Sequence, residues 1–396
     1  MTIDRPAACP ACGSSKLEPF LEVEGLPVHV GVVWESAAAA GACPKGRMGL
    51  ALCRRCGFVT NLDFDPSLVD YGRRYDNALH FSPFFQKYER ELAERLIGRY
   101  GLRGQHVLEL GCGSGHFLGL LCGLADARGT GFDPSHDPER ADPALQGRAS
   151  VRREIYSERH ADVPADLVCC RHVLEHLPEP RALLATLRRT LAGRPDTVLY
   201  FEVPCAYLIL RDGSIWDLMY EHCGYYVPSS LAYLFRSSGF DVLDVAEAYE
   251  GQFVGLEARP ARQGDRELEA PPPPETAELS RLVAAFSERF RTTRAAWQER
   301  VATLRAQGRR IVVWGAGGKT VGFMSLLGLG DAIDAVVDVN PGKQGSYLAG
   351  SGQPILAPDA LRERRPDVVI VMNPVYRREI EERLAGLGLA PELLTP

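Results

Sequence analysis

The chain has 396 residues, of which 45% are hydrophobic and 24% are charged, and its formal net charge is −6 at pH 7. This length exceeds one ordinary core, so two or three domains are expected. The acidic balance argues against a general nucleic-acid binder, and no apolar run is long enough to span a bilayer. The N-terminus lacks the pattern of a secretory signal, so we expect a cytoplasmic protein whose 11 cysteines are reduced.

Two cysteine motifs of the form C-x-x-C-G, at 9–13 and 53–57, predict a structural zinc site. Four thiolates on two tight turns make a closed tetrahedral shell that leaves no position for water or substrate. The gap between the motifs is longer than in a compact zinc ribbon, so residues 17–52 are expected to loop out. A redox pair is the alternative. The expected ligands are Cys9, Cys12, Cys53 and Cys56, with Cys43 as a bystander.

The first long helix is predicted after the second cysteine motif. Apolar residues at helical spacing indicate a helix that begins at Ser82-Pro83 and ends at Gly101. The segment before it is polar and aromatic. Its Tyr75 and His80 either line a pocket over a cofactor or only pack within a loop, and the sequence leaves both interpretations open.

The most informative segment is 107–118, VLELGCGSGHFL. It is typical of a buried parallel strand, a glycine turn and a helix. Glu109 places a carboxylate just before the turn. Gly111, Gly113 and Gly115 let the backbone approach a ligand closely and adopt positive φ.

A second strand, at 129–132, ends in Asp133 about one β-α-β unit later, the position that holds ribose hydroxyls in a doubly wound sheet. A lone glycine turn is a weak signal, whereas the form E-x-G-x-G-x-G is more specific. It resembles the first motif of class I S-adenosylmethionine-dependent methyltransferases. A generic nucleotide pocket is the alternative.

Strands and helices alternate from 105 to about 259, which predicts one doubly wound α/β domain. Ligands gather at the carboxyl ends of the strands in such a sheet, and the end of the third strand usually contacts adenine. Judged singly, each polar residue at these ends is more often a capping or packing residue than a functional one. The candidates there are Glu154, Ile155, Arg171, His172, His176 and Glu202.

The segment 219–231 joins an acid, a histidine and three tyrosines ahead of an amphipathic helix. A carboxylate beside an imidazole can hold its tautomer and raise its basicity. Glu221 and His222 are therefore a candidate acid–base pair. An aromatic turn that caps the helix is the alternative.

The last third of the chain predicts a second α/β unit. A proline-rich linker at 259–277 leads into a long helix at 279–304 and then a strand and glycine turn at 311–319. Thr320 stands where the third glycine of a dinucleotide fingerprint would be, and too little chain remains for six strands. These features argue against nicotinamide binding and favour a half-Rossmann fold that serves packing or phosphate contacts.

The order of these parts resembles the three-domain sugar C-methyltransferases of antibiotic deoxysugar pathways. The resemblance implies a zinc-binding domain at 1–80, a class I S-adenosylmethionine-dependent domain at 81–260, a linker and long helix at 261–308, and a Rossmann-like substrate-binding domain at 309–396. The implied cofactors are S-adenosylmethionine and structural Zn²⁺. The implied reaction methylates the carbon next to the ketone of a nucleotide-linked 4-keto-deoxysugar, commonly C3, through an enolate.

The resemblance also implies roles for single residues. His222 matches the base that removes the proton, and Glu221 is its orienting neighbour. Tyr220 is the candidate for an expected tyrosine near this pair. His176 and Tyr75 would line the sugar pocket.

Some positions depart from the family pattern. Met219 stands where the sugar enzymes commonly have the tyrosine, and the segments 250–254 and 372–376 also differ. Another activated sugar, a small ketone, or O- or N-methylation therefore stays open, as does a non-catalytic zinc-dependent binding protein. The expected partner is a small molecule, with neither nucleic acid nor membrane, and the expected assembly is a monomer or homodimer.

Overall fold

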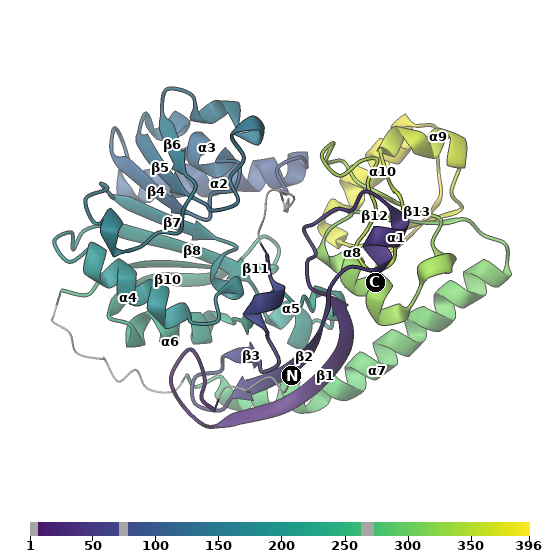
Figure 1. Ribbon diagram of the computed structural model, residues 1–396, viewed down its shortest axis with the longest axis horizontal. Helices are drawn as coiled ribbons and strands as arrows, with labels where there is room; N and C mark the ends of the chain where they lie inside the picture. The colour runs from purple at the N-terminus through teal and green to yellow at the C-terminus, as the bar shows by residue number, and fades with distance from the viewer. Residues whose placement is uncertain (1–6, 71–77, 263–272) are drawn as a thin grey trace.

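The computed structural model describes residues 7–70, 78–262 and 273–396. Their strands form three sheets: a four-stranded N-terminal sheet, a seven-stranded central sheet and a five-stranded C-terminal sheet. In Figure 1 the central sheet lies on the left, the C-terminal sheet on the right, and the N-terminal strands run below and between them. No helix of the described ranges combines the length and the apolarity needed to cross a membrane.

The N-terminal sheet is antiparallel. The sequence predicted that residues 17–52 loop out, and this is wrong: most of them form two long paired strands. The reason is the alternation of Met48, Leu50 and Leu52, whose side chains are buried against the rest of the molecule. The sheet has the order β1-β2-β3-β9. Its elements are β1 (Leu17–Pro27), α1 (Ala37–Gly41), β2 (Lys45–Cys53), β3 (Val59–Asn61) and β9 (Gly224–Tyr225).

The first long helix, α2 (Pro83–Tyr100), has the predicted bounds. The Ser82 side chain accepts a hydrogen bond from the Phe85 amide at its start, and Gly101, at φ 64°, ends it in the left-handed conformation.

The central sheet confirms the predicted doubly wound fold, in the order β10-β11-β8-β7-β4-β5-β6. Only β11 runs antiparallel to its neighbours. The chain reverses its direction of winding between β4 and β7, and ligands bind at such a switch point. The strands are β4 (His106–Leu110), β5 (Arg128–Phe132), β6 (Ala149–Arg152), β7 (Leu167–Arg171), β8 (Val198–Pro204), β10 (Phe240–Ala248) and β11 (Phe253–Pro260). The helices are α3 (His116–Ala125), α4 (Pro180–Thr190), α5 (Tyr207–Leu210) and α6 (Pro228–Ser237).

The C-terminal sheet is entirely parallel, in the order β14-β13-β12-β15-β16. It extends the predicted half-Rossmann fold on both sides of β12, which creates a second switch point. The elements are α7 (Thr276–Ala306), β12 (Ile311–Trp314), α8 (Gly318–Leu327), β13 (Ala335–Val337), β14 (Ile355–Leu356), α9 (Leu361–Arg364), β15 (Val368–Val371), α10 (Arg377–Gly386) and β16 (Glu392–Leu394).

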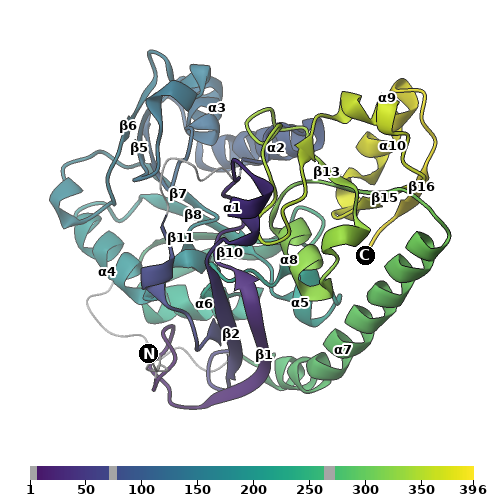
Figure 2. The same cartoon turned by 45° about the vertical axis from the view of Figure 1, so that its right-hand side comes forward.

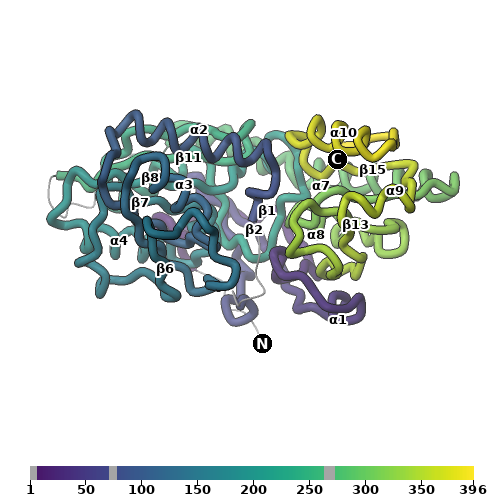
Figure 3. Tube along the Cα trace, turned by 90° about the horizontal axis from the view of Figure 1, so that it is seen from above, coloured from purple at the N-terminus to yellow at the C-terminus, as the bar shows by residue number. Residues whose placement is uncertain are grey.

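The three parts pack around one segment of the chain. Figures 2 and 3 show β1 and β2 between the lobe of the central sheet and the lobe of the C-terminal sheet. Residues 215–226 contact both the N-terminal sheet and the lobe of the C-terminal sheet. Trp216 packs its ring against Phe323 of α8, with centroids 4.8 Å apart, and Tyr225 pairs with Val59 of β3.

Candidate active site

A cavity of about 1050 Å³ lies between the carboxyl ends of the central and C-terminal sheets. Residues at the ends of β4, β7 and β8 line it on one side, and residues after β12 and β13 line it on the other. Ligand pockets for one drug-sized molecule rarely exceed about 1000 Å³. The cavity is therefore large enough for two small ligands that meet.

The glycine turn after β4 forms part of this wall. Gly111 has φ 70°, and a Cβ added to it would lie 2.1 Å from Val173 Cγ2. The Asp133 carboxylate accepts hydrogen bonds from the Gly113 amide at 2.8 Å and the Ser135 amide at 2.7 Å. The end of β5 thus fixes the shape of the turn, and Asp133 itself lines the cavity.

Gly115 has a different role from the one the motif suggested, because it is not on the cavity wall. It precedes α3 with φ 84°, and a Cβ there would meet Leu145 Cδ1 at 2.5 Å. Its lack of a side chain permits the turn and the packing.

Glu154 and Ile155 line the cavity beyond β6, where adenine contacts were expected. Glu154 pairs with Arg159 and lies 3.2 Å from His160. The Ile155 side chain is 74% exposed, an apolar surface beside the pocket.

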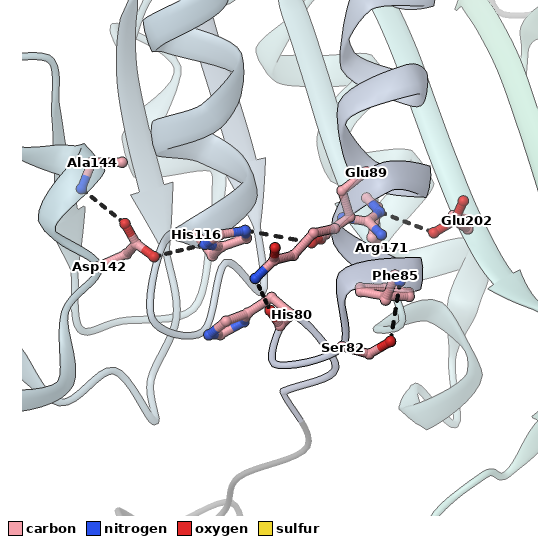
Figure 4. Close-up of polar contacts among 10 residues, drawn as sticks. His80, Ser82, Phe85, Glu89, His116, Asp142, Ala144, Arg171 and Glu202 are labelled. Carbon is pink, nitrogen blue, oxygen red and sulfur yellow. Dashed lines mark hydrogen bonds and ion pairs between the residues drawn. The ribbon is translucent and has the colours of Figure 1, made fainter. Parts of the chain in front are cut away.

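Arg171 also lines the cavity, but its charge is directed to carboxylates. The guanidinium lies 2.9 Å from Glu89 and 2.9 Å from Glu202, and over the Phe117 ring. His172 follows it with φ 55°, and its amide donates to the Glu202 carbonyl at 2.8 Å. This part of the wall is a buried ion network, shown in Figure 4.

Two histidines that line the cavity lie next to each other. The His176 and His222 rings meet edge to face with centroids 4.9 Å apart. Burial lowers the pKa of His176 to about 4 and the pKa of His222 well below its usual value. Both imidazoles are therefore neutral at pH 7, the form in which histidine accepts a proton.

Glu175, which sequence reasoning did not single out, lies next to these rings. Its carboxyl oxygen is 3.9 Å from His172 Nδ1 and 4.0 Å from His176 Nε2. Burial raises the pKa of Glu175 to about 8, and the charges of Glu202 and Glu221 add to this effect. A protonated carboxyl group therefore faces the cavity at neutral pH.

The two residues before His222 do not line the cavity. The Tyr220 hydroxyl accepts a hydrogen bond from the Asp65 amide at 2.9 Å, and its ring is buried. Glu221 accepts from the Val30 amide at 2.9 Å, and its other oxygen lies 3.9 Å from His176 Nδ1. Tyr220 and Glu221 precede His222 directly in the sequence, but the turn directs their side chains toward the N-terminal part of the chain and not toward the cavity. Tyr75 lies outside the described residues.

The N-terminal sheet holds the segment that carries His222. The Cys223 carbonyl accepts hydrogen bonds from the Asn61 amide at 3.0 Å and the Thr60 hydroxyl at 3.2 Å. Strand β9 follows directly and pairs with β3. The position of the imidazole thus depends on a sheet formed by the first part of the chain.

The four cysteines of the two motifs come together beside this sheet. The sulfurs of Cys9 and Cys56 are 3.7 Å apart, and those of Cys12 and Cys53 are 3.5 Å apart. Tetrahedral zinc with Zn–S bonds near 2.3 Å places its sulfurs about 3.8 Å apart. The cluster therefore fits a zinc ion, and Cys43 lies outside it.

The opposite wall comes from the glycine turn after β12. The helix α8 begins at this turn, and the Lys319 ammonium forms an ion pair with Asp217, 2.6 Å from its Oδ1. The Asp338 carboxylate accepts from the Ala316 amide at 2.6 Å and so fixes the turn. A helix N-terminus with a lysine beside it is suited to phosphate.

A further contact between the lobes had no signal in the sequence. Gln252 and Asn373 exchange two amide hydrogen bonds, at 3.0 and 2.8 Å, and the Tyr249 hydroxyl donates to that of Tyr376 at 2.7 Å. These residues line the cavity and join its two walls.

Comparison with known proteins now identifies the two lobes. Residues 84–245 match a methyltransferase domain, and residues 275–389 match a C-methyltransferase C-terminal domain. The C-methyltransferase NovU of Streptomyces niveus is 28% identical over 394 residues, which cover 94% of this chain and 90% of NovU. The chain thus joins a methyltransferase domain to a C-methyltransferase C-terminal domain, and it is similar to a C-methyltransferase over nearly its whole length. It is an S-adenosylmethionine-dependent enzyme.

Other relatives resemble a smaller share of this C-methyltransferase. A ubiquinone biosynthesis O-methyltransferase of Neisseria meningitidis serogroup C is 29% identical over 168 residues, which cover 37% of this chain and 68% of that protein. Among solved structures, the DhpI complex with S-adenosylhomocysteine is 23% identical with a TM-score of 0.34, and covers 46% of this chain and 88% of DhpI.

Proposed function

We propose that this enzyme methylates the carbon next to the ketone of a nucleotide-linked 4-keto-deoxysugar, at C3. The observation that carries the proposal is the neutral His222, buried on the wall of a cavity large enough for methyl donor and sugar together. The full-length similarity to a C-methyltransferase supports a carbon acceptor.

The residues of the cofactor side fit S-adenosylmethionine. The glycine turn has no room for a side chain at Gly111, Asp133 stands at the position that holds ribose hydroxyls, and Ile155 offers an apolar surface to adenine. When bound, S-adenosylmethionine supplies an electrophilic methyl group. The protein must then generate a carbon nucleophile.

In the proposed reaction, His222 accepts the proton from the carbon next to the ketone, because its imidazole is neutral and the residue lines the cavity. The negative charge that develops moves onto the ketone oxygen. Glu175, protonated up to about pH 8, is the donor for that oxygen. The His176 Nδ1 lies 3.2 Å from the Glu221 carbonyl and must donate to it, which orients the ring against His222.

The nucleotide is assigned to the C-terminal domain. The N-terminus of α8 and Lys319 would hold the diphosphate, and Asp217 would then share its lysine partner with the substrate. We also propose that Cys9, Cys12, Cys53 and Cys56 hold a structural Zn²⁺, and that the domains have the limits expected from the sequence.

The experiment that tests the proposal is product analysis. The purified enzyme is incubated with ¹³C-methyl-labelled S-adenosylmethionine and dTDP-4-keto-6-deoxyglucose or its 2-deoxy analogue. A new methyl signal at the chemical shift of C–CH₃ in the NMR spectrum supports it. A signal at the shift of O–CH₃ or N–CH₃ would contradict the carbon acceptor, and turnover only of ketones without a nucleotide would contradict the substrate class.

A further inference from the structure

Glu89 is an acid in an apolar position. It lies on the face of α2 that carries Phe85 and Leu92, one helical turn from each, and it is only 4% exposed. Acidic side chains are almost never buried without partners, because desolvation of the charge is costly. Its contacts therefore need an explanation.

One of its two oxygens has a strong partner. Glu89 Oε1 accepts a hydrogen bond from Arg171 Nη1 at 2.9 Å, and Arg171 Nε donates to Glu202 Oε1 at 2.9 Å. Figure 4 shows this row of charges, from Glu89 through Arg171 to Glu202. Arg171 thus holds the first oxygen of Glu89, which lines the cavity, and leaves its second oxygen, Oε2, for another partner.

The second oxygen has no hydrogen-bond donor among the described residues. His116 Nε2 lies 3.5 Å from it, while His116 Nδ1 lies 2.7 Å from the Asp142 carboxylate. The separation of 3.5 Å from Glu89 Oε2 is longer than that of an ordinary N–H···O hydrogen bond, and a carboxylate oxygen can accept from more than one donor. Glu89 Oε2 can therefore accept a hydrogen bond from a further donor beside His116.

Glu109, on the neighbouring β4, is in the same condition. It is 4% exposed, lines the same cavity, and its Oε2 also has no donor within the described ranges. Burial raises the pKa of Glu109 to about 8. The charge of Glu89 adds to this rise, whereas Arg171 opposes it. Two carboxyl oxygens without donors thus lie on one wall of the methyl-donor pocket.

We propose that Glu89 is a cofactor-binding residue whose Oε2, with Glu109, accepts hydrogen bonds from the α-ammonium group of the methyl donor. The local charge fits a cation: two acidic side chains, Glu89 and Glu202, share the single guanidinium of Arg171, and a bound ammonium group would favour the ionised form of Glu109. The inference rests on the methyl-donor pocket and is independent of the sugar substrate.

The test is calorimetric binding of three nucleosides to the full-length protein. S-adenosylhomocysteine has both the ammonium and the carboxylate, its aminopropyl analogue has only the ammonium, and 5′-methylthioadenosine has neither. In Glu89→Gln, the affinity for the first two falls by about tenfold or more, because a charge-assisted hydrogen bond is lost. The affinity for 5′-methylthioadenosine stays within about twofold of wild type.

Glu202→Gln is the matched control, because Glu202 is the other partner of Arg171 but does not line the cavity. It is expected to change all three affinities by the same factor. If Glu89→Gln is poorly folded by circular dichroism, Glu89→Asp, which keeps the charge but withdraws the oxygens, is expected to show the same selectivity with a smaller loss.

Three results would overturn the proposal. Equal loss for all three ligands in Glu89→Gln means that the residue only supports the fold. Loss of affinity for S-adenosylhomocysteine alone means that this wall of the pocket recognises the carboxylate of the ligand and not its ammonium group. Unchanged affinities mean that Glu89 does not reach the ligand. If wild type binds none of the three, the pocket itself is misassigned, a failure distinct from that of the sugar substrate.

Discussion

At the scale of single residues, His222 is placed by the fold and not by its neighbours in sequence. The ring packs against His176, whereas the Glu221 carboxylate contacts the Val30 amide. The two rings are buried together, and this lowers both pKa values. An imidazole buried in this way needs no adjacent carboxylate to be neutral at pH 7.

Replacing His222 should abolish the chemistry without loss of cofactor binding. His222→Gln is expected to lower kcat/KM by about 10²–10⁴-fold, the usual contribution of a general base. The affinity for S-adenosylhomocysteine should not change. Tyr220→Phe is the control: it removes only the acceptor of the Asp65 amide, so activity should stay within about threefold and stability should fall by about 1 kcal/mol. A larger kinetic effect in Tyr220→Phe than in His222→Gln would reverse the assignment.

The lowered pKa values predict the response to acid. A base with a lowered pKa stays neutral as the pH falls, so kcat/KM should show no acid limb near the ordinary histidine value of 6.5 and should fall only at lower pH. Stability, in contrast to kcat/KM, should already fall in this pH range. Between pH 6.5 and about 4 the unfolded chain protonates His176 while the folded protein does not, so stability present above pH 6.5 is lost as the pH falls.

Urea unfolding should report this loss. The contribution of His176 is roughly 2 kcal/mol between pH 6.5 and pH 5 in wild type, and it should be absent in His176→Gln. The pH profile would contradict this account if kcat/KM of the wild type fell near pH 6.5 and this fall were altered in His222→Gln. The His222 imidazole would then be solvated.

At the scale of elements, glycines in one turn should differ in their tolerance of alanine. Gly111→Ala meets Val173 Cγ2 at 2.1 Å in addition to a φ of 70°, whereas Gly113→Ala, at φ 55°, meets nothing within 4 Å. We expect losses of about 2–4 kcal/mol for Gly111→Ala and about 1–2 kcal/mol for Gly113→Ala in the free energy of unfolding. Equal losses would mean that Val173 moves freely and that the turn is not constrained by it.

Elements with local signals could be predicted from the sequence. The bounds of α2 follow from a capping serine, a proline and a final glycine, and the first five strands of the central sheet, β4 to β8, follow from short apolar runs that alternate with helices. Strand β9 could not be predicted, because two residues carry no period and their partner, β3, is distant in the chain. The hydrogen bonds between Gln252 and Asn373 could not be predicted either, because these residues are also far apart in the sequence. Glu89 did carry a signal, an acid on an apolar helix face, which the helix pattern alone could have revealed.

At the scale of the whole molecule, three sheets meet at residues 215–226. The cysteine cluster supports the N-terminal sheet, that sheet holds the His222 segment, and the C-terminal lobe closes the cavity from the other side. The cofactor wall, in contrast, is built within the central sheet. Damage to the N-terminal part should therefore separate catalysis from cofactor binding.

Removal of the proposed zinc ion tests this separation. Treatment with a chelator, or Cys56→Ser, should lower the rate of methyl transfer by at least about tenfold, because the closed shell stabilises the fold around it. The affinity for S-adenosylhomocysteine should be retained. Cys43→Ser, a buried cysteine outside the cluster, is the control and should keep its metal and its activity. Full activity in protein shown to be free of metal would contradict the structural role.

Hydrogen exchange at the substrate carbon tests the central claim most directly. The enzyme is mixed in D₂O with S-adenosylhomocysteine and dTDP-4-keto-6-deoxyglucose or its 2-deoxy analogue, so that no methyl group can transfer. The account predicts that wild type replaces the hydrogen next to the ketone by deuterium, seen as loss of its proton NMR signal, and that His222→Gln does not. Methylation of the same sugar by wild-type enzyme without such exchange, or equal exchange by His222→Gln, would contradict it.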